Sequence, residues 1–175
     1  MVAKHVVALI TMALVLGACT ADGGLQPGFG ISRVTGDQPL GGDQRVVPDA
    51  AVTAGVQAVR AALSSGGERA LVQQTDRCSA ALRGGLPRQY EGEPAAARRM
   101  MEFCFAFDTT VTKMALAEQR TNPAWTQIPQ LRIASLRSRL MAYPPRLGVR
   151  EVERQAVTGD VSDRVGIAMQ RLQGT

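Results

Sequence analysis

From Pro48 onward, apolar side chains recur with the spacing of an α-helix, and this pattern constrains the fold more than any other feature. In the first such stretch Val52, Val56, Val59 and Leu63 fall on one stripe of a helix. The alternation of apolar and polar residues that is typical of a half-buried strand is not sustained anywhere. Aromatic residues make up only 4% of the chain, so a core must consist mainly of aliphatic side chains, which favours packed helices over a sheet. The sequence predicts an all-α domain.

Helix start and stop signals divide residues 48–175 into about five or six helices. Proline suits a first turn and glycine a helix end, so these residues mark the boundaries. The first helix is expected to begin at Pro48-Asp49 and stop at residues 64–67, and the longest to run from about Pro94 to Arg120 with Met100, Cys104, Phe107 and Val111 inward. A second helix is expected with Leu71, Cys78 and Leu82 inward, and a fourth from Pro129 to Pro144-Pro145 with Ile133, Leu136, Leu140 and Tyr143 inward. A short fifth helix is expected with Val149, Val152 and Ala156 inward. A sixth is expected to be capped by Asp160, with Val165, Ala168 and Leu172 inward. Short connections predict an irregular bundle of antiparallel neighbours.

The chain has three cysteines, of which Cys78 and Cys104 lie on the apolar stripes of successive expected helices. In an oxidising compartment these two are expected to form a disulfide. Such a bridge would contribute about 3.5 kcal/mol in the chain-entropy model. The alternative is a pair of reduced, buried cysteines that only pack. No Cys-x-x-Cys motif is present, so the bridge is interpreted as structural rather than redox-active.

Residues 1–18 have the composition of a secretory signal peptide. Lys4 precedes an apolar run from residue 6 to residue 16, which is too short for the roughly 20 residues of a membrane-spanning helix. The run leads into Leu16-Gly17-Ala18-Cys19, which resembles the lipobox of bacterial lipoproteins. The resemblance covers residues 1–19 only, and it implies cleavage before Cys19 and acyl chains attached to its sulfur. By similarity to lipoproteins of Gram-negative bacteria, Thr20 favours the outer membrane, with the domain facing the periplasm or the cell surface.

Residues 19–47 are expected to form the lipidated amino terminus and a disordered tether. The stretch is rich in glycine and has no sustained apolar period, which argues against packed structure. As a flexible coil it would span roughly 30 Å on average. The alternative is that residues 29–31 dock on the domain. The predicted organisation is therefore a signal peptide (1–18), a tether (19–47) and a helical domain (48–175).

The only histidine, His5, lies in the expected signal peptide. A mature chain without imidazole excludes Ser–His–Asp and Cys–His catalysis and every histidine-containing metal site. We assign no catalytic residue, metal or cofactor. Asp108 borders the apolar stripe of the longest expected helix, where burial would raise its pKa; pairing with an arginine or a neighbouring hydroxyl is the structural alternative. Glutamates available for carboxylate chemistry are Glu68, Glu102, Glu118, Glu151 and Glu153.

Arginine accounts for nearly all of the positive charge in a chain of net charge +5. Arg98 and Arg99 stand near the start of the longest expected helix, the unfavourable end for a cation. Arg132 and Arg139 are expected to share a face of the fourth helix. These four residues are candidates for binding an anionic partner, and a solvated surface is the alternative. An exported protein is not expected to meet nucleic acid.

The leading functional hypothesis is a non-enzymatic, membrane-tethered helical module that binds a protein partner in the cell envelope. A secretion, pilus or conjugation machine, or an accessory of surface assembly, would suit such a module. Two alternatives remain open at this point. One is an enzyme that acts on cell-wall glycan with carboxylates, and the other is a protein that binds anionic lipid or lipopolysaccharide through its arginines.

Overall fold

The computed structural model describes residues 45–84, 92–118 and 124–173, and all regular elements in these ranges are helical, which confirms the all-α prediction there. The signal peptide, Cys19 and the tether up to residue 44 lie outside the described residues. Four helices are longer than one turn, fewer than the five or six expected. In chain order the elements are α1 (Asp49–Leu82), α2 (Pro94–Glu118), α3 (Ala124–Gln127), the 3-10 turn η2 (Pro129–Leu131), α4 (Ile133–Arg146), the 3-10 turn η3 (Glu151–Glu153) and α5 (Arg154–Gln173).

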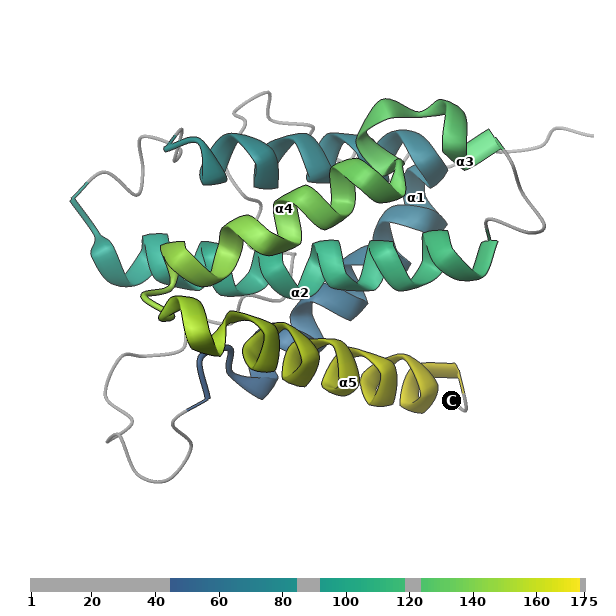
Figure 1. Cartoon of the computed structure of the whole chain (residues 1–175). Helices are drawn as coiled ribbons and strands as arrows, with labels where there is room; N and C mark the ends of the chain where they lie inside the picture. Colours follow the sequence, from purple (N-terminus) through teal and green to yellow (C-terminus); the bar gives the residue numbers. More distant parts are fainter. Residues whose placement is uncertain (1–44, 85–91, 119–123, 174–175) are drawn as a thin grey trace, which may run out of the picture.

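Helix α2 occupies the centre of the bundle. Figure 1 shows it between α1, which lies behind and above, α4, which crosses its front, and α5, which runs beside it. Every side chain from Met100 to Thr112 is buried, so burial extends well beyond the expected stripe. A helix that is packed on all sides loses its solvent-exposed face. The sequence pattern predicts one buried face, whereas the packing of three helices around α2 buries every face between Met100 and Thr112.

Helix α1 changes direction at Gly67, where the sequence predicts a helix end. Gly67 has φ +57° and ψ −142°, a conformation that side-chain-bearing residues rarely adopt, so it separates two helical segments within Asp49–Leu82. The first segment crosses behind α2 and the second runs alongside it (Figure 1). Near Gly55 the first segment approaches α2 so closely that a Cβ atom would lie 2.7 Å from the backbone nitrogen of Phe107.

In place of the expected fifth and sixth helices, the structure has the 3-10 turn η3 followed by a single helix, α5, which corrects the prediction. Asp160 lies inside α5 rather than at its start, and its carboxylate accepts a hydrogen bond of 2.6 Å from Arg164, one turn later. Val152, expected to point inward, is 84% exposed, whereas Val161 and Val165 are fully buried. Because α5 packs against α1, α2 and α4, tertiary contacts carry the helix through Gly159 despite its low helix propensity.

Helix α4 begins at Ile133, after η2, and continues through Pro144 and Pro145 to Arg146, beyond the predicted end. The two prolines lack backbone N–H groups, so residues beyond them close the last turn. The N–H of Leu147 donates to the carbonyl of Tyr143 at 3.0 Å. The two prolines in the final turn of α4 therefore do not terminate the helix, which ends at Arg146.

The domain starts slightly before Pro48. Val47 is fully buried and Val46 packs against the core, although the sequence predicts that both belong to the tether. Pro48 follows them directly, and its carbonyl accepts hydrogen bonds from the N–H groups of Ala51 and Val52 in the first turn of α1. Among the helices of the described ranges, none combines the length and the apolar character needed to cross a bilayer.

Candidate functional site

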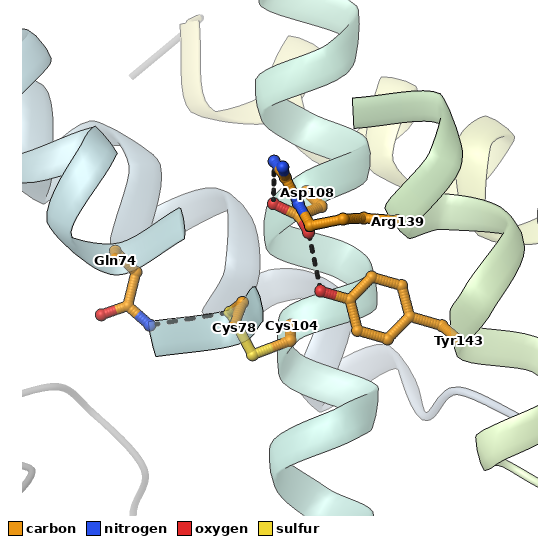
Figure 2. Close-up of a disulfide and its surroundings, with 6 residues drawn as sticks. All are labelled: Gln74, Cys78, Cys104, Asp108, Arg139 and Tyr143. Carbon is orange, nitrogen blue, oxygen red and sulfur yellow. Dashed lines mark hydrogen bonds and ion pairs between the residues drawn. A yellow bond between two sulfur atoms is a disulfide. The ribbon is translucent and has the colours of Figure 1, made fainter. Parts of the chain in front are cut away.

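Asp108 is the most completely buried charged residue in the described domain, with no exposed side-chain surface. Its Oδ2 accepts hydrogen bonds from Nε of Arg139 at 2.9 Å and from the hydroxyl of Tyr143 at 2.6 Å. Its Oδ1 accepts a bond of 3.3 Å from Nη2 of Arg139. Figure 2 shows these three side chains, which we call the Asp108 cluster, meeting between α2 and α4.

The helical repeat of α4 positions the two donors of the cluster. Arg139 and Tyr143 are four residues apart, so their side chains leave α4 on the same face and meet α2 together. The ring of Tyr143 stacks on Phe105 with centroids 5.3 Å apart. Nη2 of Arg139 also donates to the carbonyl of Gln130 at 3.2 Å. The cluster therefore joins α2, α4 and η2.

The electrostatics of the cluster follow from its burial. Burial raises the pKa of Asp108, while the hydrogen bond and charge of Arg139 and the hydrogen bond of Tyr143 oppose the rise. Burial, followed by the nearby Asp108 charge, raises the pKa of Tyr143 well above 10.0. Both carboxylate oxygens of Asp108 have partners and the residue has no exposed surface, so the ion pair and the hydrogen bonds fix α4 on α2. Pairing with an arginine, the structural alternative for Asp108, is confirmed.

Glu102 is the second buried carboxylate of the described domain, with a side chain 8% exposed. Its Oε1 accepts a hydrogen bond of 2.8 Å from Nε of Arg98, one turn earlier on α2. Burial raises the pKa of Glu102, and Arg98 and Arg99 oppose the rise. A raised pKa suits a general acid. Asp108 is paired with Arg139 of α4, whereas Glu102 is paired with Arg98 of α2 itself.

The four arginines predicted to bind an anion are not brought together. Arg98 pairs with Glu102, and Arg99 is exposed beside it at the start of α2. Arg132 is exposed immediately before α4. Arg139 is only 12% exposed and its guanidinium binds Asp108 of the same chain. The expectation that Arg139 presents its charge to an external partner is therefore replaced by an internal ion pair.

The predicted disulfide between Cys78 and Cys104 is present, with their Cα atoms 5.4 Å apart. Both residues are fully buried, and the bridge ties the second segment of α1 to α2 (Figure 2). The side-chain amide of Gln74 lies 3.8 Å from the Cys78 sulfur. Because neither sulfur is exposed, the position favours a structural bridge over a redox-active one.

One polar contact that sequence reasoning missed joins the two ends of the domain. Arg164 donates to Asp49 at 2.8 Å and to Asp160, and its side chain is only 13% exposed. The hydrogen bond from Arg164 is the main cause of a lowered pKa at Asp49. The spacing of Asp160 and Arg164 is a readable helical pair. The bond to Asp49 has no local signal, because the two residues are far apart in sequence.

Neither the arrangement of possible metal ligands nor a comparison with known proteins assigns a function to the chain. In the described ranges, His, Cys, Asp and Glu side chains form no group of three or more that could hold a metal ion. Compared with protein-family models, curated proteins and solved structures, the chain matches none.

Proposed function

We propose that this protein is a lipoprotein anchored through Cys19 to the outer membrane, whose helical domain binds a protein partner in the cell envelope without catalysing a reaction. The observation that carries the proposal is Leu16-Gly17-Ala18-Cys19 placed directly after a basic start and a short apolar run. Acyl chains on Cys19 would hold the chain at a membrane by burying methylene groups, each contributing about 0.8 kcal/mol.

The disulfide between Cys78 and Cys104 supports export, because such bridges persist in oxidising compartments and are rare in the cytosol. The pairing of both buried carboxylates with arginines of the same chain supports a binding role over a catalytic one. Asp108 is held inside by Arg139 and Tyr143, and Glu102 is paired with Arg98. A partner in a secretion, pilus, conjugation or surface-assembly machine would suit a small domain on a long tether.

The anchor is tested by mass spectrometry of the native amino terminus. We expect an acylated peptide beginning at Cys19 in the membrane fraction. Cys19→Ser should lose the acylated peptide and release the chain from membranes, whereas the neighbouring control Thr20→Ser should behave as the native protein. A native polypeptide that is unlipidated and still begins with Met1 would overturn the proposal.

The binding role is tested by chemical crosslinking in intact cells followed by identification of the crosslinked proteins. Recovery of one specific envelope protein is expected, and recovery of none would contradict the role. Two further assays test the alternatives. Turnover of peptidoglycan that Glu102→Gln abolishes would favour an enzyme. Salt-sensitive binding to anionic vesicles, without a protein partner, would favour a lipid-binding protein.

A further inference from the structure

The stretch between Glu118 and Glu151 contains arginine but no aspartate or glutamate. Elsewhere in the domain, acidic residues accompany the arginines, as in α5, where Asp160 and Asp163 precede Arg164. Helix α4 lies wholly within the acid-free stretch and cannot neutralise its own charge. The arginines of the stretch are Arg120, Arg132, Arg137, Arg139, Arg146 and Arg150.

Of the arginines in this stretch, Arg137 and Arg146 are described by the structure as exposed and have no ion pair there. Arg139 binds Asp108, and Arg150 pairs with Glu153. Arg137 and Arg146 are exposed on α4. Within the part of the chain that the structure describes, no ion pair joins either of them to a carboxylate. Their charge is therefore directed at solvent or at another molecule.

Arg137 borders an exposed apolar surface on α4. Met141, one turn later, is 52% exposed, and it is one of four large apolar side chains that are exposed in the described domain. The neighbouring exposed residues are small, which allows another chain to approach the helix closely. We call this surface the α4 outer face; it consists of Ala134, Arg137, Ser138, Met141, Ala142 and Pro145.

We propose that the α4 outer face is the docking surface for an acidic segment of the protein partner. This inference rests on the proposed function and names the chemistry of the partner. Aspartate and glutamate would complement the unpaired charge of Arg137, since a guanidinium binds a carboxylate through two parallel hydrogen bonds. A protein fits better than a membrane. Met141 is the only large apolar side chain on this face, whereas helices that enter a lipid interface carry several, including aromatic residues.

Site-specific photocrosslinking tests this surface in the full-length protein in intact cells. The photoreactive residue benzoylphenylalanine replaces Met141 or, as a matched control, Ile167 of α5, which is 48% exposed. We expect one envelope protein to crosslink from position 141 and not from 167, through a peptide rich in Asp and Glu. Arg137→Glu should lower the yield from position 141 at least about tenfold, because like charges would then face each other. Arg77→Glu, the same charge change on an exposed residue of α1, should alter it by no more than about twofold.

Several outcomes would overturn the inference. Crosslinking from position 167 but not 141, a captured peptide without acidic residues, or a yield that ignores Arg137→Glu would each exclude this surface while leaving a protein partner in place. Lipid adducts at position 141, together with vesicle binding weakened by Arg137→Glu, would assign the face to a membrane. The absence of a crosslinked product at both positions would exclude the α4 outer face. The proposed function would then also fail only if chemical crosslinking recovered no envelope protein.

Discussion

The carboxylate of Asp108 illustrates how strongly surroundings determine what a single residue does. An aspartate with no exposed surface is costly unless it is paired and hydrogen-bonded. Arg139 and Tyr143 supply three hydrogen bonds, so the charge is compensated inside the bundle. Compensation of this kind has a known asymmetry: removing one partner is more damaging than removing the whole pair.

Substitutions in the ion pair should reveal that asymmetry. Arg139→Met leaves the Asp108 charge without its main partner and should reduce the free energy of unfolding by about 3–5 kcal/mol. Adding Asp108→Leu should restore part of this loss, because the buried charge is then gone. Arg137→Met, on the exposed side of the same helix, should change stability by less than about 0.5 kcal/mol. Urea denaturation followed by circular dichroism measures all three, and equal losses for Arg139→Met and Arg137→Met would contradict the role of the cluster.

Tyr143 should make the fold sensitive to alkali. Its pKa is raised well above 10.0 in the folded protein, so the unfolded chain releases the proton first as the pH rises. The contribution of Tyr143 to the free energy of unfolding is thus fully present below pH 10. As the pH rises above 10, this contribution falls by up to about 1.4 kcal/mol per pH unit. Tyr143→Phe should be less stable at neutral pH by about 1–3 kcal/mol, and the difference from the native protein should narrow above pH 10. Unfolding free energies that run parallel from pH 7 to pH 11 would exclude this behaviour.

At the scale of elements, helix boundaries and helix contacts obey different rules. Prolines and glycines marked the starts of α1 and α2 and the break at Gly67 correctly, since these residues act on the local backbone. The continuity of α5 was missed because its packing against three other helices outweighs a weak local signal at Gly159. The close contact between α1 and α2 at Gly55 likewise has no signature in the helical repeat.

Two glycine-to-alanine substitutions separate these effects. In Gly55→Ala the new methyl carbon would lie within 3.0 Å of backbone atoms of Ala106 and Phe107, so the helices must move apart. We expect a loss of about 1–3 kcal/mol. In Gly159→Ala nothing lies within 4 Å of the new carbon, and α5 should be stabilised by about 0.5–1 kcal/mol. Thermal unfolding curves compare the two, and shifts of the same sign would show that the contact at Gly55 does not limit the approach of α1 to α2.

At the scale of the whole molecule, α2 holds the bundle together through residues on successive turns. Cys104 binds α1 through the disulfide, and Asp108, one turn later, binds α4 through Arg139 (Figure 2). A covalent bond and a buried ion pair therefore fix the two helices that flank α2 on different sides.

Removing the disulfide should destabilise the whole domain. Cys78→Ala with Cys104→Ala frees the second segment of α1 in the unfolded chain, and the expected loss is about 3.5 kcal/mol for a bridge across 26 residues. A reductant should lower the unfolding midpoint of the native protein but leave the double variant unchanged. If reductant and substitution both leave the midpoint in place, the bridge does not stabilise the fold.

The sequence by itself determined the helical class, the starts of α1 and α2, the break at Gly67 and the pairing of Cys78 with Cys104. These depend on backbone hydrogen bonds, apolar spacing and the presence of two cysteines on apolar stripes, all of which can be read within a few turns. Tertiary structure alone decided that α2 is central, that Arg139 faces Asp108 rather than solvent, and that Val152 is exposed. Each of these depends on which helix covers which face, and residues far apart in the chain settle that through packing and desolvation.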